Sequence, residues 1–277
     1  MKRSLGNKRR YLDQGAIDEI TREHGTLTAS KTCKIFDNAD FGYRRITVHR
    51  PLRLRFQMTT EKKERYLDAC PELLDAVLAV EEELGNEPYF NWNQTWIEVQ
   101  NIIRSLPDNL EGWAKGAKGM AQKKLFREVF TEVDPEAMPI IAKHHKNLQL
   151  DIEELFPDQR LPELPPGELW ELLGLHHNGK THLEHEHDPN LKDFENIPLK
   201  ENIVSYFLRE VRPYVADAWI DRATLDEQDG GIGKVGYEIN FNREFFEYKP
   251  PRPLEEIDAE LAQVEKRIME LLREVTE

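Results

Sequence analysis

The sequence has few of the features that cross-link a chain or place it in a membrane. Two cysteines, Cys33 and Cys70, occur among 277 residues, too few for a disulfide framework or a cysteine-based metal site. No apolar run approaches the roughly 20 residues that span a bilayer, and no apolar stretch of a signal peptide follows the N-terminal MKRSLGNKRR. These absences predict a cytoplasmic, reduced protein that does not enter a membrane.

A catalytic or cofactor signature is also lacking. The segment 231–236, GIGKVG, matches the dinucleotide fingerprint, but that fingerprint needs a strand before it and a helix after it to hold the phosphate. Here residues 226–229 are acidic and turn-like, and residues 237–241 have the pattern of a strand. We therefore interpret 231–236 as the glycine-rich loop of a hairpin. No Ser-His-Asp or Cys-His grouping can be assigned from the sequence.

One short segment is rich in potential metal ligands. Its flanks resemble a loop, it contains no cysteine, and it lacks the i, i+4 spacing of a helical catalytic site, although histidine spacings of this kind can bind zinc. We therefore favour a solvated histidine-rich loop that binds metal only adventitiously, and we expect no designed metal site. The residues concerned are His176, His177, His182, His185, His187 and Asp188.

The net charge of −14 is unevenly distributed. Residues 1–57 contain 13 Lys and Arg against 6 Asp and Glu, whereas the rest of the chain contains 25 against 46. A basic end on an acidic protein is typical of an anion-binding segment, and nucleic acid is the obvious anion.

This basic end includes an arginine-rich strand pattern. From Arg45 to Phe56 apolar residues alternate with polar ones, which predicts a strand with one exposed face, and Pro51 predicts a break or an edge strand. Guanidinium groups on that face suit phosphate contacts. The alternative is that they pair with carboxylates of the protein itself. The candidate DNA-binding residues are Arg44, Arg45, Arg50, Arg53 and Arg55.

Periodicity along the chain predicts a mainly α protein with small β elements, an α+β fold that ends in a coiled-coil-like helix. Helices are expected over 13–24 and 199–214 and from Pro135 or Pro139 to Leu148, and a strand over 236–248. Four prolines between 156 and 167 indicate a linker. We divide the chain into a basic segment with short strands (1–57), a helical region (58–155), a Pro/His-rich linker or loop (156–193), an α+β segment (194–249) and a heptad helix (250–277).

The last 24 residues carry a heptad repeat with alternating spacings of three and four. Such spacing gives a narrow apolar stripe with charged flanks, which requires another helix beside it. Three heptads are marginal as an isolated helix, so a partner chain or a helix elsewhere in this chain must cover the stripe. The alternative is a terminal helix folded back on its own domain. The candidate partner-binding residues are Leu254, Ile257, Leu261, Val264, Ile268, Leu271 and Val275.

Long strings at both ends of the chain point to a family. They are SLGNKRR (4–10), IDEI (17–20), KIFDN (34–38), DFGYRRITV (40–48) and RPLRL (50–54), and then ENIPLKE (195–201), REVRP (209–213), DAWID (217–221), GYEINF (236–241) and PPRPLEEI (250–257). In these strings, and in their order, the chain resembles the C-terminal region of the modification (methylase) subunit of type I restriction–modification systems. The resemblance covers 1–57 and 194–277, and the middle is weakly matched.

The resemblance implies transfer of a methyl group from S-adenosylmethionine to N6 of adenine in DNA, in a complex with a specificity subunit and a restriction subunit. In the family, the cofactor-binding glycine motif and the Asn-Pro-Pro-Phe-type catalytic motif lie upstream of the matched region, and this sequence contains neither. N6 transfer needs groups that hold the flipped adenine. We therefore expect no catalytic or cofactor-binding residue here, with Met1 at a position internal to a full-length subunit.

The resemblance also implies a role for the two ends. We expect the heptad helix to pack on helical regions of the specificity subunit, and the basic segment to face DNA or the missing catalytic domain, in a chain that is inactive alone. One alternative is a methyltransferase completed by a separate N-terminal methylase fragment. The other is a stand-alone DNA-binding or assembly protein with no role in methylation.

Overall fold

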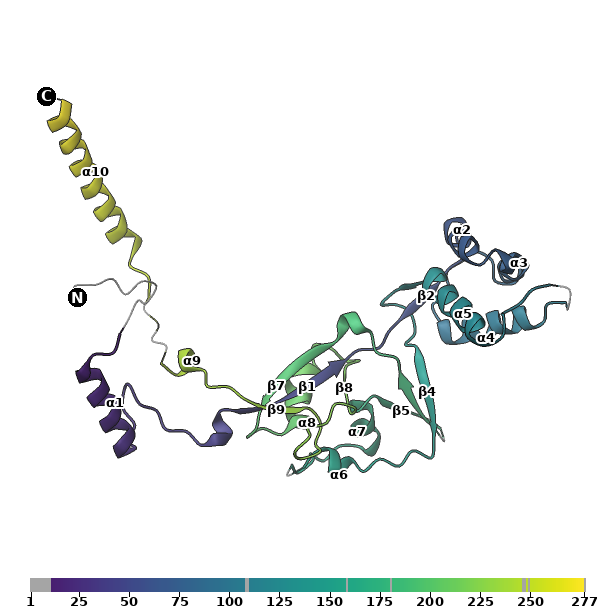
Figure 1. Cartoon of the computed structure of the whole chain (residues 1–277), viewed down its shortest axis with the longest axis horizontal. Helices are drawn as coiled ribbons and strands as arrows, with labels where there is room; N and C mark the ends of the chain where they lie inside the picture. The colour runs from purple at the N-terminus through teal and green to yellow at the C-terminus, as the bar shows by residue number, and fades with distance from the viewer. Residues whose placement is uncertain are drawn as a thin grey trace. The chain divides into compact units, whose positions relative to one another are not determined.

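The computed structural model describes residues 11–107, 110–157, 159–179, 181–245, 248 and 250–276 (Figure 1). Asp37–Glu238 form one compact unit, and the residues before and after it are grouped in a second. Helices and several small sheets both contribute, so the mixed α+β class expected from the sequence is confirmed.

A four-stranded antiparallel sheet is built around strand β1 (Gly42–His49). One edge of β1 pairs with β7 (Asp193–Pro198), and the other edge pairs with β8 (Trp219–Ile220) and β9 (Lys234–Tyr237). The inward side chains of β1, Ile46 and Val48, join an aliphatic core with α8 (Ile203–Tyr206) and the π-helical turn η4 (Phe207–Val211).

The strand that begins as β1 ends at His49, just before Pro51, as the sequence predicts. Strand β2 (Leu54–Phe56) leaves the first sheet and pairs with β3 (Thr131–Val133). Because proline has no N–H to donate to a ladder, the break divides the arginine-rich segment into two short strands.

Four helices pack around an aromatic core beside β2: α2 (Thr60–Ala69), α3 (Leu74–Leu84) after the turn η2 (Pro71–Leu73), α4 (Trp92–Arg104) and α5 (Gly116–Phe130). The Thr59 side chain accepts a hydrogen bond from the Lys62 amide and caps the start of α2. Phe56, Tyr66 and Phe126 are fully buried in this core.

Two expectations for the middle of the chain are wrong. The helix expected up to Leu148 is instead strand β4 (Ile141–Lys146), followed by the short helix α6 (Ile152–Leu155). The stretch 156–193, expected to be a linker or loop apart from a short helix over 168–175, contains that helix as α7 (Pro166–Leu172), but also β5 (Leu175–Asn178), β6 (Thr181–His185) and the turn η3 (Pro189–Leu191). The reason is long-range pairing, because β4, β6 and β5 form one antiparallel sheet.

Three helices lie outside the compact unit. Helix α1 (Gln14–Thr26) begins after Asp13, whose carboxylate accepts from the Ala16 amide, and it confirms the helix expected near the N-terminus. The strand expected over 236–248 ends at Tyr237, and α9 (Phe241–Phe245) follows it. Helix α10 (Leu254–Thr276) occupies the heptad segment. No helix in the described part of the chain is both long and apolar enough to cross a membrane.

Candidate functional site

The arginine-rich segment does not present one exposed arginine face. Arg44 is only 7% exposed, and its guanidinium pairs with Asp229 and donates to the Ile232 carbonyl over 3.2 Å. The hydrogen bond from Arg44 lowers the pKa of the Asp229 carboxyl. Arg44 points inward because it has the same strand parity as Ile46 and Val48.

Three further arginines pair with carboxylates of the same chain. Arg50 and Arg53 share Asp217, at 3.2 and 3.1 Å. Arg55 contacts Glu132 at 3.1 Å and a second carboxylate, that of Asp134, at 3.5 Å. The alternative left open by the sequence, pairing within the protein, therefore holds for Arg44, Arg50, Arg53 and Arg55, and a DNA contact by these four stays a prediction.

Arg45 differs from its neighbours because it is exposed and makes no ion pair with any described carboxylate. Its guanidinium lies 4.2 Å from the ring centroid of Phe194, and Lys192 Nζ lies 5.3 Å from the same centroid. Strand register places Arg45 opposite Lys234 of β9, on the same side of the sheet. We call Arg45, Lys192, Phe194 and Lys234 the basic sheet face. Phe194 is 44% exposed, so this surface combines cations with an accessible aromatic ring.

The heptad residues form an apolar stripe along α10. Glu255 and Glu256 in the first turn and Arg273 in the last turn complement the helix dipole. Ile257 is partly buried, and the side chain of Val275 lies outside the described side chains. The other five, Leu254, Leu261, Val264, Ile268 and Leu271, are 75%, 61%, 54%, 51% and 54% exposed.

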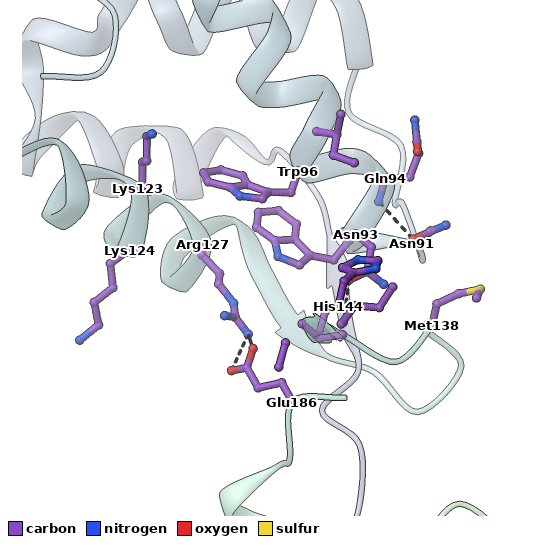
Figure 2. Close-up of a pocket in the computed structure, with 15 residues that line it drawn as sticks. Asn91, Asn93, Gln94, Trp96, Lys123, Lys124, Arg127, Met138, His144 and Glu186 are labelled. Carbon is purple, nitrogen blue, oxygen red and sulfur yellow. Dashed lines mark hydrogen bonds and ion pairs between the residues drawn. The ribbon is translucent and has the colours of Figure 1, made fainter. Parts of the chain in front are cut away.

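A groove of about 750 Å³ lies between α4, α5 and β4 (Figure 2). The rings of Trp92 and Trp96 stack in it with centroids 5.2 Å apart, and Lys123 and Lys124 lie along the α5 side. Arg127 forms an ion pair with Glu186 and donates hydrogen bonds to both of its carboxylate oxygens, at 3.0 and 2.9 Å. The groove can accommodate an apolar or aromatic group with a negative charge, but it contains no free carboxylate for acid–base chemistry.

The histidine-rich segment is not the solvated loop that we expected. Most of it forms the β5–β6 hairpin, in which the rings of His176, His182 and His185 are half-buried and that of His177 is exposed. His187, which follows β6, is also exposed. His49 and His187 stack at 4.2 Å with an interplanar angle of 8°, and His176 and His185 stack at 4.3 Å and 30°. No group of three or more His, Cys, Asp or Glu among the described residues is arranged to hold a metal ion.

The glycine-rich segment 231–236 is only in part the hairpin loop that we expected, because residues 234–236 lie in β9, which pairs with β1. Leu225 bridges Ile232, and β9 follows directly, where a dinucleotide site would need a helix. Gly230 and Gly233 have φ angles of 71° and 87°, which favour glycine, and a side chain on Gly233 would meet the Arg45 carbonyl at 2.7 Å.

Sequence reasoning missed several residues of these surfaces. Lys192, Phe194 and Lys234 have no motif in common, and only the register of β1 with β7 and β9 brings them to Arg45. His49 likewise joins the hairpin histidines only because residues 51 and 187 pair. Comparisons with known protein families, with curated proteins and with solved structures found no match.

Proposed function

We propose that this chain is an assembly module of a type I DNA-methylating complex, in which α10 docks on helices of the specificity subunit as a coiled coil. The observation that carries the proposal is the heptad stripe, whose side chains are more than half exposed from Leu254 to Leu271, apart from the partly buried Ile257. The family resemblance of the sequence strings supports the choice of partner. It also implies a restriction subunit in the same complex.

The proposal assigns no catalytic role to this chain alone. The sequence contains no Asn-Pro-Pro or Asp-Pro-Pro string, and its glycine-rich match leads into a strand. We therefore place S-adenosylmethionine binding and methyl transfer on another polypeptide, such as a separate N-terminal methylase fragment. The free thiols Cys33 and Cys70 support our assignment of the assembly to the cytoplasm.

The physical argument for docking is the shape of the stripe. Burying one large apolar side chain stabilises by about 1.5–3 kcal/mol, and the heptad stripe of α10 has five that are more than half exposed. A narrow stripe with charged flanks fits one or two neighbouring helices and is less suited to a broad core.

The test is co-expression of residues 1–277 with a cognate specificity subunit, next to a version truncated after Arg252. We expect the full chain to co-purify and the truncated chain to be lost. Co-purification of both chains would mean that binding of the specificity subunit does not require α10. Binding of S-adenosylmethionine by this chain alone, measured by calorimetry, would contradict the non-catalytic assignment.

A second role, DNA contact, is favoured by the basic sheet face. Arg45 and Lys192 flank an exposed aromatic ring, and Arg45 has no described carboxylate partner. Phosphates accept hydrogen bonds from guanidinium and ammonium groups, and an exposed ring can stack on a base. DNA affinity that is absent or independent of salt would contradict this role, because phosphate contacts release counterions. DNA binding without any subunit partner would instead favour a stand-alone DNA-binding protein.

A further inference from the structure

Seven of the nine histidines lie in β4, β5 or β6 or just after β6, and an eighth, His49, ends β1. The exception is His24, which is exposed in α1. Such a concentration is notable because histidine is the side chain whose charge changes in the range of pH 5 to 8. Neither the docking proposal nor the DNA proposal uses these residues.

The first stack joins the end of β1 to the segment after β6. The His49 and His187 rings lie nearly parallel, and the edge of Trp219 meets His49 with centroids 6.0 Å apart. Backbone hydrogen bonds run beside the stack, from Leu52 to the Glu186 carbonyl at 2.7 Å and from Asp188 to the Arg50 carbonyl at 2.9 Å. His49 is 8% exposed, and its Nε2 has no hydrogen-bond partner.

The second stack lies within the hairpin, between His176 of β5 and His185 of β6. The Nε2 atom of His176 is also buried without a partner. A proton on Nε2 of His176 would place a charge where no hydrogen-bond acceptor meets it. The second imidazole of the stack, His185, lies at a centroid distance of 4.3 Å.

The charges around the stacks come from several elements. His49 faces His187, Asp221 and Lys192, of which only Asp221 favours a proton. His176 faces Glu171 of α7, which favours a proton, and Arg212, which opposes it. His185 faces its stacking partner and Arg53, both of which oppose a proton.

Burial is the largest cause that lowers the pKa of His49, His176 and His185, in the last case to about 4. A histidine whose pKa is lower in the closed state favours that state when it is neutral. Its contribution is complete above the ordinary value of 6.5 and is lost as the pH falls from 6.5 toward 4, because the open state binds the extra proton.

We propose that the two histidine stacks form an acid-sensitive joint, which holds the β5–β6 hairpin closed and attached to the β1 sheet while the imidazoles are neutral and opens when they are protonated. The His49–His187 stack bridges segments that are far apart in the sequence, and the His176–His185 stack joins the two strands of one hairpin. Protonation therefore separates these pairings without unfolding the aromatic core around Phe126. The proposal stands without any partner chain.

The test is amide hydrogen exchange of the full chain between pH 7.5 and 4.5, corrected for the intrinsic pH dependence of exchange. We expect protection over residues 175–188 to fall on the order of tenfold per pH unit below 6.5 for each proton taken up on opening. Helices α2 to α5 should keep their protection. Unchanged hairpin protection at pH 4.5, or an equal loss in the helices, would overturn the proposal.

A double variant, His176→Phe with His187→Phe, keeps an aromatic ring at every stacking position and removes one titrating group from each stack. We expect its hairpin protection to depend less steeply on pH than that of the wild type. His24→Gln is the matched control and should respond as the wild type does.

The wild type alone offers a second readout, should the double variant fail to fold. Imidazole titrations followed by NMR should place the pKa values of His49, His176 and His185 below the ordinary value of 6.5, with protonation coinciding with the loss of hairpin protection. Midpoints of the three at 6.5 or above, with the hairpin still protected, would contradict the joint.

Discussion

The compact unit Asp37–Glu238 and helix α10 treat their apolar side chains in opposite ways. The unit packs two clusters of buried apolar residues, although side chains such as Met120 and Tyr214 remain 70% and 82% exposed. It also pairs Arg44, Arg50, Arg53 and Arg55 with its own carboxylates. Helix α10 leaves most of its heptad stripe more than half exposed. The unit therefore has an apolar core of its own, whereas α10 leaves most of its stripe uncovered, which is the observation behind the docking that we propose.

The aromatic core of the compact unit should give the largest loss of stability on a single substitution. Phe126 is fully buried, with its ring centroid 4.5 Å from that of Phe130 and 5.4 Å from that of Tyr66. We expect Phe126→Ala to lower the free energy of unfolding by about 3–5 kcal/mol, because it removes contacts and leaves a cavity. Denaturant unfolding followed by tryptophan fluorescence measures this. A loss below about 1 kcal/mol would mean that the unit is not packed as described.

An intermediate effect is expected at the buried ion pair. Asp229→Asn would leave the Arg44 guanidinium, with a side chain 8% exposed, without its carboxylate. We expect a loss of about 1–3 kcal/mol, since Asp229 itself is 35% exposed.

The pH dependence of this pair has a defined sign. The pKa of Asp229 is lowered from 3.8, so its contribution is present above that value and is lost as the pH falls through the lower folded value. Urea titrations at several pH values should show the wild type and Asp229→Asn converging in stability below pH 3.8. A constant difference down to acid pH would contradict the assigned pairing.

A smaller effect separates Arg45 from the paired arginines. If the basic sheet face contacts DNA, Arg45→Ala should weaken binding and reduce the slope of log K against log salt by about 1. Fluorescence anisotropy with a labelled duplex at several salt concentrations measures both quantities. The matched control is Arg50→Ala, whose guanidinium is paired with Asp217. Equal effects at both positions would mean that pairing with a carboxylate does not decide which arginine contacts DNA.

Local signals in the sequence were enough for the elements that depend on local chemistry. Asp13 was correctly placed at the start of α1, and Pro51 marked the break between β1 and β2. The heptad spacing anticipated a helix over the last residues, and α10 is that helix.

Elements that depend on strand pairing between distant parts of the chain could not be predicted from the sequence. The strand β4 was expected to be helical, because its partner β6 lies some 40 residues further on, as the pairing of His145 with His182 shows. Pairing of β5 with β6 also explains why the histidine-rich segment, expected to be a loop, forms a hairpin. Alternation alone could not decide which arginines face inward, because that depends on the core beneath β1.

The central claim is that the heptad stripe of α10 is the docking surface for a helical partner. The most direct measurement compares two double variants of α10 in co-purification with the specificity subunit. Leu261→Glu with Ile268→Glu places two charges in the stripe, and Gln263→Glu with Met269→Glu places two on the outer, exposed side of the same helix.

We expect both variants to unfold within about 0.5 kcal/mol of the wild type, because exposed positions contribute little to stability. The stripe variant should lose the specificity subunit, and the outer-face variant should retain it. Retention of the subunit by the stripe variant, or an equal loss by both variants, would contradict the account.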